Sequence, residues 1–271
     1  MLEKIKQTAE FIKSKTKVSP EIGIILGSGL GNLVNGIKIA TKMKYEDIPN
    51  FPLSTVEGHS GQLIFGEIAG KQVVAMQGRF HYYEGYSMEQ VTFPVRVMKF
   101  LGIHTLMVSN AAGGLNKNFN VGDLMIITDH INHFPENPLR GKNYDELGPR
   151  FPDMSKVYNK QLIEKALGIG KNHQLPLKKG IYIGSTGPTL ETPAEYRLFG
   201  IFGADATGMS TVLETTVAHH MGIRCFGVSV ITNADKPKTE DGETTHDEVQ
   251  DVAGQVAPKL TLLFSELIRS M

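Results

Sequence analysis

Short apolar runs rich in isoleucine and valine recur along the chain, with stretches of helical spacing between some of them. Runs that are apolar at consecutive positions are typical of strands buried on both faces of a sheet. They lie at residues 22–26, 72–77, 105–109, 123–128, 180–185 and 223–231. The helical patterns lie at 87–101, 155–168 and 211–221. Because strands alternate with helices, we expect an α/β fold with a mixed, largely parallel twisted sheet flanked by helices.

Both ends of the chain predict amphipathic helices. Residues 1–15 place four apolar side chains at helical spacing with charges between them; they are Leu2, Ile5, Ala9 and Ile12. Near the other end, Thr245 and Glu248 have the spacing of a capping box, and an apolar stripe follows. Pro258 interrupts this stripe, so we expect it at a kink or facing solvent. The charged segment 235–244 is interpreted as a mobile cover.

Length and composition favour a single domain over residues 1–271. The chain has 271 residues, 41% of them apolar, which is enough for one sizeable core. No linker, repeat or low-complexity segment divides it. One long irregular stretch, 132–152, is rich in proline, glycine and asparagine. Loops of that length in a compact domain tend to be functional.

Charge and cysteine content exclude several classes of protein. Lysine plus arginine equals aspartate plus glutamate at 28 each, so no net field favours nucleic acid or an anionic membrane. The one cysteine, Cys225, lies in an apolar run, and we expect a buried, unreactive thiol without a disulfide. No apolar run approaches the roughly 20 residues that span a bilayer, and the N-terminus does not resemble a signal peptide. A cytoplasmic setting fits these features.

The segment "EIGIILGSGLGNL", residues 21–33, leads from a buried strand into a glycine-rich turn. Such turns often bind phosphate through backbone N–H groups. The spacing G-x-G-x-G departs from the dinucleotide fingerprint G-x-G-x-x-G, and Asp47, near the distance for a ribose-binding acid, lies in a loop. We therefore favour a phosphate loop that carries the Ser28 hydroxyl, with a turn that binds nothing as the alternative.

Three further motifs are interpreted as carrying no ligand. "GEIAGKQ", residues 66–72, is too short between its glycines for a nucleotide P-loop and predicts a hairpin turn between two strands. His130 and His133 in "HINH" lack a H-E-x-x-H helix or a cysteine partner, so we expect polar loop histidines and no metal. The G-x-S-x-G elbow of serine hydrolases does not occur.

Polar and small residues follow several predicted strands, where α/β sheets bind ligands. After the strand 72–77 come Arg79, whose planar fork suits phosphate, and His81. After the strand 105–109 comes "NAAGGLN", whose small residues let backbone N–H groups approach an anion. Farther along, Glu191 follows a turn and precedes a predicted helix, Ser210 lies at a helix start, and a buried strand ends in Thr232 and Asn233. A carboxylate and an amide can read a heteroaromatic ring, so the pattern predicts a site for an anion and a flat polar partner.

Together these segments resemble the trimeric branch of the purine nucleoside phosphorylase family. The matching pieces are "GSGLG", "GHSGQL", "GRFHYYEGYS", "NAAGGLN", "GPRFPDMS", "GPTLETPAEYR", "GADATGMST", "ITNADK" and "HDEV", in this order between residues 27 and 249. The resemblance implies a sheet partly closed into a barrel and the phosphorolysis of purine nucleosides to a free base and ribose 1-phosphate. It also implies a homotrimer that needs inorganic phosphate as co-substrate and no metal or organic cofactor.

The resemblance assigns roles to individual residues. The phosphate cradle would comprise Ser28, His59, Arg79, His81, the backbone N–H of Ala111 and Ser210, with Glu84 orienting His81. The ribose contacts would be Tyr83, Met209, His246 and, lent by the neighbouring subunit, Phe151. The purine pocket would comprise Glu191, Asn233, Thr232, Leu190 and Thr207. The catalytic set would be His81, Glu84, Asn233 and Glu191.

Glu191 favours 6-oxopurine nucleosides such as inosine and guanosine, because it would accept the N1–H that adenine lacks. Leu190 and Thr207 stand where mammalian members have larger or more apolar residues. "NADK", residues 233–236, also resembles methylthioadenosine phosphorylases, so a 6-aminopurine or methylthioadenosine phosphorylase is the alternative. A nucleoside-binding module without catalysis and an NAD-dependent oxidoreductase are the hypotheses from other classes.

Overall fold

The computed structural model describes residues 1–27, 30–53, 55, 60–234 and 245–271. Within these ranges, only the backbone is described at Asn32 and His246. Ser28, His59 and the proposed cover 235–244 lie outside the described residues, as does the side chain of His246. No helix in the described ranges is long and apolar enough to cross a membrane.

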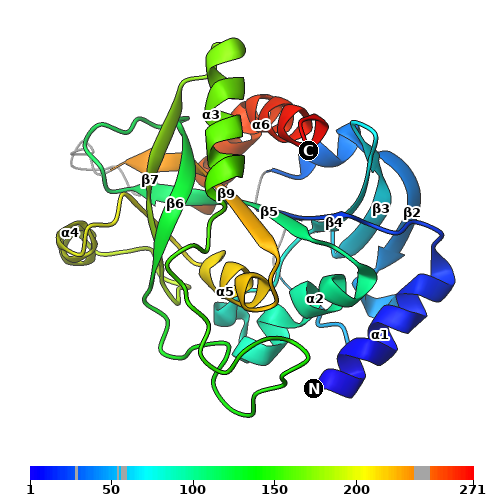
Figure 1. The fold of residues 1–271 in the computed structure, drawn as a ribbon. Helices are drawn as coiled ribbons and strands as arrows, with labels where there is room; N and C mark the ends of the chain where they lie inside the picture. Colours follow the sequence, from blue (N-terminus) through cyan, green and yellow to red (C-terminus); the bar gives the residue numbers. More distant parts are fainter. Residues whose placement is uncertain (28–29, 54, 56–59, 235–244) are drawn as a thin grey trace.

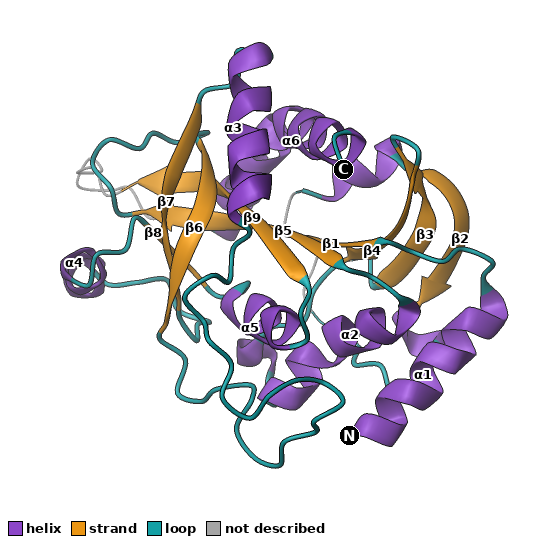
Figure 2. Cartoon of the chain, viewed as in Figure 1, coloured by secondary structure: helices purple, strands orange, loops and turns teal. Residues whose placement is uncertain are grey.

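The strands of the described residues form one mixed sheet in the order β2-β3-β4-β1-β5-β8-β7-β6-β9. Their bounds are β1 Ile22–Leu26, β2 Lys38–Lys44, β3 Gln62–Ile68, β4 Lys71–Gln77, β5 Thr105–Gly114, β6 Leu124–Asn132, β7 Leu177–Gly184, β8 Ala206–Gly208 and β9 Arg224–Ala234. Since β9 also pairs with β5, the last five strands of this order close into a barrel, and β1, β4, β3 and β2 extend from it (Figure 2). The expected mixed sheet that partly closes into a barrel is confirmed.

Helices cover both faces of the sheet. They are α1 Leu2–Lys15, α2 Met88–Leu101, α3 Lys160–Asn172, α4 Pro193–Ile201, α5 Val212–His220 and α6 His246–Arg269. Figure 1 shows α1, α2 and α5 on one face, α3 and α6 on the other, and α4 beside the barrel. Strand β1 is buried on both faces: Ile24 packs in the cluster that contains Leu263 of α6, and Ile25 packs in the cluster that contains Met98 of α2. This double burial explains its unbroken apolar run.

Each apolar run identified in the sequence is a strand, but β5, β6, β7 and β9 extend further than their runs. β5 continues to Gly114, so "NAAGGLN" is mostly strand and not a turn as we expected. Its glycines pair closely with β8 and β9, which apolar periodicity does not reveal. β6 continues to Asn132, so the expectation of a loop histidine is wrong for His130, whose Nδ1 lies 3.1 Å from the Tyr158 hydroxyl.

Turn residues and helix caps determine where several of the helices and strands begin and end. The helix expected over 155–168 begins at Lys160, because the Asn159 side chain accepts a hydrogen bond from the Leu162 backbone N–H at 3.0 Å and caps it there. The hairpin turn between β3 and β4 is confirmed, with positive φ at its two residues, Ala69 and Gly70. Thr245 and Glu248 form the expected capping box of α6. Pro258 faces solvent and Cys225 is buried, both as expected.

Candidate active site

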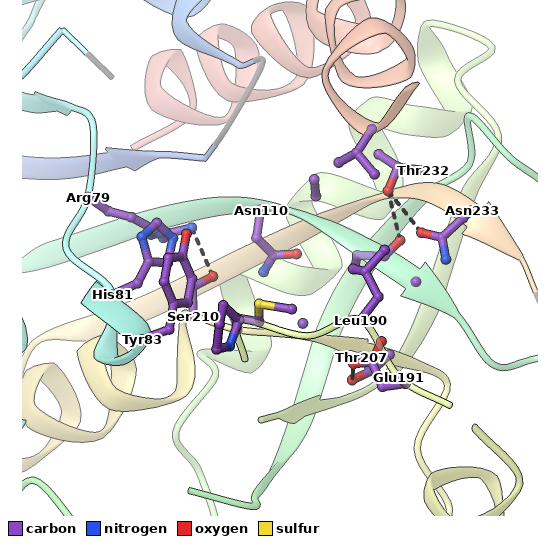
Figure 3. A pocket seen from close by; sticks show the side chains of 17 residues that line it. Arg79, His81, Tyr83, Asn110, Leu190, Glu191, Thr207, Ser210, Thr232 and Asn233 are labelled. Atoms are coloured by element: carbon purple, nitrogen blue, oxygen red, sulfur yellow. Dashed lines mark hydrogen bonds between the residues drawn. The ribbon is translucent and has the colours of Figure 1, made fainter. Parts of the chain in front are cut away.

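A cavity of about 400 Å³ lies where β5 and β9 end, at the carboxyl edge of their parallel pair. Figure 3 shows two groups of side chains around it, with Asn110 between them. Arg79, His81, Tyr83 and Ser210 form one group, and Leu190, Glu191, Thr207, Thr232 and Asn233 form the other. The remaining lining residues are Ala111, Ala112, Gly113, Pro188, Gly208, Met209 and Val249. Ligands of open α/β sheets bind at this edge.

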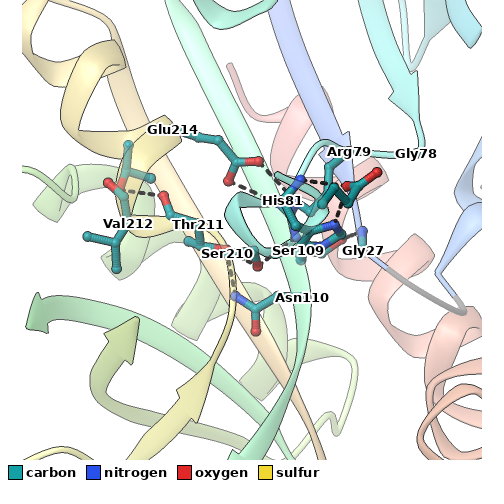
Figure 4. A network of polar contacts seen from close by, with 12 residues as sticks. Gly27, Gly78, Arg79, His81, Ser109, Asn110, Ser210, Thr211, Val212 and Glu214 are labelled. Carbon is teal, nitrogen blue, oxygen red and sulfur yellow. Dashed lines mark hydrogen bonds and ion pairs between the residues drawn. The ribbon is translucent and has the colours of Figure 1, made fainter. Parts of the chain in front are cut away.

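Arg79 is the cation of the first group, and it is almost entirely buried, at 1% exposure. Its Nε and Nη2 donate to the two carboxylate oxygens of Glu214 at 3.0 and 3.2 Å (Figure 4). Its Nη1 donates to the Ser109 carbonyl at 2.8 Å and to the Ser210 hydroxyl at 3.1 Å. These bonds fix the plane of the guanidinium. Of its five N–H donors, one on Nη2 has no partner among the described residues, so the group retains a donor for an anion.

Ser210 is presented by a tight turn at the start of α5. The backbone N–H of Val212 donates to the Ser210 carbonyl at 2.7 Å, and Thr211 between them has φ 70° and ψ −51°, which is a γ-turn. A β-branched residue with positive φ is strained, so the surroundings must hold it. Thr211 is fully buried, and its hydroxyl accepts a hydrogen bond from Asn110 Nδ2 at 2.9 Å. The strained residue, Thr211, therefore directly follows Ser210, whose hydroxyl accepts the hydrogen bond from Arg79.

The backbone of β5 opens beside this group. On one edge β5 pairs with β9 along its whole length, but on the other edge β1 stops opposite Val108 and β8 starts opposite Gly113. Among the described residues, no strand pairs with that edge between these two positions. Ala111 lies in the gap and lines the cavity. An N–H group on an unpaired edge needs a partner, and a bound anion can supply one.

His81 lines the cavity in the same group of side chains as Arg79. Its Nδ1 lies 3.1 Å from Glu84 Oε1, and since a carboxylate only accepts, Nδ1 carries the proton. Burial lowers the pKa of His81 below its usual range, and the neighbouring Arg79 lowers it further against the pull of Glu84. Burial would raise the pKa of Glu84, but hydrogen bonds from His81 and Thr55 outweigh it and lower this pKa to about 2. His81 is therefore neutral at pH 7, beside a fully ionised Glu84.

Tyr83 stacks on His81, with ring centroids 4.7 Å apart and 16° between the planes. Burial raises the pKa of Tyr83 to about 12, so its hydroxyl stays protonated. Met209 also lines the cavity, and its side chain lies next to Gly187, as the Tyr83 ring does. An aromatic face, a hydroxyl and a thioether between an anion site and a polar pocket suit a sugar.

The second group holds two side chains that can read a ring, and each has a hydroxyl partner. Glu191 Oε1 accepts from the Thr207 hydroxyl at 2.7 Å. Asn233 Nδ2 donates to the Tyr196 hydroxyl at 2.7 Å, and Asn233 Oδ1 accepts from Thr232 at 3.3 Å. The carboxylate and the amide therefore have fixed orientations before any ligand arrives.

The structure brings most of the predicted site residues together. Those that line the cavity are Arg79, His81, Tyr83, Ala111, Leu190, Glu191, Thr207, Met209, Ser210, Thr232 and Asn233. Glu84 lies behind His81, and Phe151 does not line the cavity of its own chain, where it is 88% exposed. The first turn of α6, which begins at His246, reaches the cavity through Val249.

Several residues in or beside the site were not predicted from the sequence, among them Asn110, Tyr196, Glu214 and Val249. Glu214 had a detectable signal, since it is an acid within the apolar helical segment "STVLETTVA". Tyr196 lies on α4 and contacts Asn233 from outside the cavity lining, so no local pattern marked it. Within the described ranges, no three histidine, cysteine, aspartate or glutamate side chains are placed to hold a metal ion.

The cavity joins a buried arginine to a carboxylate and an amide on a sheet partly closed into a barrel, an arrangement that suits a phosphorylase. Residues 21–269 match the model of the Phosphorylase superfamily. The chain is 56% identical over 256 residues to purine nucleoside phosphorylase 1 of Bacillus subtilis, covering 94% of each chain. It also matches solved structures of Schistosoma mansoni purine nucleoside phosphorylase. The complex with inosine has 42% identity and a TM-score of 0.94 and the alignment covers 99% and 96% of the two chains; the complex with adenosine has 43% identity and the same TM-score, with 99% and 97% covered.

The chain therefore belongs to the purine nucleoside phosphorylases of the phosphorylase superfamily. It is an enzyme of the pentosyltransferase class.

Proposed function

We propose that this enzyme cleaves 6-oxopurine nucleosides, such as inosine and guanosine, with inorganic phosphate as the attacking substrate. The observation that carries the proposal is that a single cavity joins the Arg79–Ser210 anion site to the Glu191–Asn233 pair. Relatives of the chain include a protein solved with inosine. Phosphate would bind between Arg79, Ser210, His81 and the open edge of β5 at Ala111. Ser28 and His59 are proposed to complete this cradle.

In the proposed reaction, a phosphate oxygen bonds to the anomeric carbon of the sugar as the bond from that carbon to the purine nitrogen breaks. The bonding electrons leave with the purine, so negative charge develops on the ring while the sugar becomes cationic. Phosphate stabilises the cation from one side, and Asn233 hydrogen-bonds the ring at N7 on the other. A donor aimed at developing charge lowers the barrier without a covalent enzyme intermediate. No step requires a metal or an organic cofactor.

The ring would be selected by Glu191. Its second oxygen, beside the one held by Thr207, would accept the N1–H of a 6-oxopurine. Adenine presents an acceptor at that position, which leaves the carboxylate facing a lone pair. Thr232 and Leu190 would bound the ring on the other sides of the pocket. Tyr83, Met209 and His246 would contact the sugar.

We propose, from the resemblance to the trimeric branch of the family, that the enzyme works as a homotrimer. In support, Phe151 is 88% exposed and does not line the cavity of its own chain. Inserted beside the sugar of a neighbouring subunit, this ring would close that subunit's ribose site. A monomer would then have an incomplete pocket.

A substrate panel tests the function. Inosine, guanosine, adenosine and methylthioadenosine are incubated with enzyme, with and without phosphate, and release of the free base is measured. We expect rapid release from inosine and guanosine, dependent on phosphate. Faster cleavage of adenosine or methylthioadenosine would favour the 6-aminopurine alternative, and release without phosphate would contradict phosphorolysis.

A further inference from the structure

Asn233 is held by a residue that does not line the cavity. Its Nδ2 donates to the Tyr196 hydroxyl at 2.7 Å, and Tyr196 comes from α4, on the side of the barrel. The contact to Thr232 on the other end of the amide is longer, at 3.3 Å. We propose that Tyr196 is a positioning residue that acts on the purine through Asn233. This inference rests on the proposed role of Asn233 at N7 of the ring.

The backbone is shaped to admit this hydrogen bond. A Cβ atom on Gly113 of β5 would overlap the Tyr196 hydroxyl and lie 3.2 Å from Asn233 Nδ2. Since anything closer than about 3.4 Å crowds a Cβ, Gly113 provides the space in which the hydroxyl and the amide meet. Three elements therefore converge here, β5 with a glycine, β9 with an asparagine and α4 with a tyrosine.

The position of Tyr196 is set by the capping and packing of α4. Pro193 begins α4, and Thr192 and Glu195 form a capping box at its start. Phe199 anchors the helix in a small apolar cluster with Ile183, and the Tyr196 ring packs against that cluster. Glu191 immediately precedes the N-cap of α4, and Tyr196 of the same helix accepts the hydrogen bond from Asn233, so both proposed base-reading side chains are tied to the start of α4.

The orientation of the amide matters because its two ends differ chemically. The torsion that turns an asparagine amide is soft, and the end that faces the ligand decides whether it donates or accepts. One Nδ2 hydrogen is engaged by Tyr196 and Oδ1 accepts from Thr232, so the second Nδ2 hydrogen has a defined direction in which to donate. Preorganised groups of this kind cost no reorganisation when charge develops.

The first test is Tyr196→Phe, which removes the hydroxyl and keeps the ring. We expect kcat for inosine to fall roughly 3- to 10-fold, the cost of one net hydrogen bond, while KM for phosphate stays unchanged. Tyr144→Phe is the matched control, because Tyr144 loses the same atom but lies outside the lining of this cavity, beside Lys142. Equal falls in both variants, or a raised phosphate KM in Tyr196→Phe, would contradict positioning.

A ligand comparison separates positioning from a merely structural role. Hypoxanthine and 7-deazahypoxanthine differ at N7, the atom that Asn233 is proposed to contact. We expect Tyr196→Phe to weaken hypoxanthine binding, measured by calorimetry, roughly 3- to 10-fold, and to leave 7-deazahypoxanthine binding unchanged. Equal weakening of both ligands would overturn the proposal for Tyr196.

A double variant tests whether Tyr196 acts through Asn233. In an Asn233→Ala background, Tyr196→Phe should cause no further loss of kcat, because the amide it positions is gone. Additive losses would overturn the inference. A wild-type enzyme that releases no base from any purine nucleoside would instead remove the proposed function, so the two failures are distinguishable.

Discussion

Arg79 and Glu214 form a two-point ion pair with both side chains almost entirely buried, at 1% and 4% exposure of the residues. The pair joins the turn after β4 to the first turn of α5, residues 135 apart in the chain. Glu214 is not in the cavity lining, so it does not occupy the side of Arg79 that lines the cavity, where phosphate is proposed to bind. It compensates the buried charge when no anion is bound and fixes the direction of the guanidinium.

Glu214→Gln should destabilise the protein in phosphate-free buffer by about 3 kcal/mol, because removal of one partner leaves a buried charge uncompensated. Saturating phosphate should recover part of that loss, since an anion bound only by the folded state stabilises it. Urea unfolding with and without phosphate measures both effects.

Glu146→Gln is the control for this prediction. Glu146 pairs with Lys6 at 2.7 Å on the surface, and exposed pairs contribute little, so its unfolding curve should hardly move. If Glu214→Gln were as stable as the wild type without phosphate, the compensating role of Glu214 would be wrong.

Thr207→Val should lower kcat/KM for inosine roughly 3- to 10-fold and leave the phosphate KM unchanged. The substitution keeps the shape of the side chain and removes the donor that holds Glu191 Oε1 at 2.7 Å. The carboxylate then loses its fixed orientation towards the purine. Steady-state kinetics with each substrate varied in turn separates the two effects, and an increased phosphate KM would place the role of Thr207 elsewhere.

Asn233→Ala should lower kcat for inosine on the order of 10²–10³-fold, as loss of one donor to developing charge does. The ground-state affinity for inosine should change far less, because the charge on the ring develops only as the bond breaks. Rapid-mixing kinetics of a single turnover measures the chemical step directly. An unchanged kcat would refute the proposed contact to N7.

The sequence predicted those parts of the site that stand at the ends of elements. Arg79 and His81 follow β4, Asn233 lies at the end of β9 and Glu191 precedes α4, so strand ends and helix starts marked them. Tyr196 and Glu214 lie within helices, and their partners are 37 and 135 residues away. A hydrogen bond between distant segments leaves no local pattern, so the chain had to be folded to reveal it.

The strands likewise divide into those that the sequence predicts and those that depend on tertiary pairing. β1 was predicted because both of its faces are buried, whereas β2 exposes most of its residues and has no apolar run. β8 has only three residues, Ala206–Gly208, and is a strand because β5 and β7 pair with it on its two edges. Tertiary pairing decides such short elements, since their own sequence preference is weak.

The stability of the protein should fall as pH decreases from about 6.5 towards 4. Burial lowers the pKa of His130 to about 4, so the folded protein leaves His130 uncharged in this range while the unfolded chain binds a proton. Burial also lowers the pKa of His81 and of His220. The stability that these uncharged histidines contribute is therefore fully present above the histidine pKa of the unfolded chain, and it is lost as pH falls towards the lower pKa values of the folded protein.

His130→Gln isolates one of these protons. The slope of unfolding free energy against pH between 6.5 and 4 should decrease by up to about 1.4 kcal/mol per pH unit, the value for one proton. Denaturant unfolding in a buffer series measures it, and the same substitution at His173, an exposed residue after α3, serves as the control. A slope equal to that of the wild type would show that His130 is not the group that titrates.

Phe151→Ala should raise KM for the nucleoside and leave the affinity for phosphate nearly unchanged, because the ring is proposed to cover a neighbouring subunit's sugar. Val121→Ala, a control that truncates another exposed apolar side chain, should change neither the nucleoside KM nor the phosphate affinity.

Mixed assemblies test whether Phe151 acts across subunits. Asn233→Ala subunits have a disabled pocket but an intact Phe151. An excess of Asn233→Ala subunits is refolded with Phe151→Ala subunits. The active pockets of the Phe151→Ala subunits then receive a Phe151 ring from an Asn233→Ala neighbour, and the nucleoside KM of these pockets should return towards that of the wild type. A KM that stays high in the mixture would show that Phe151 does not act across subunits.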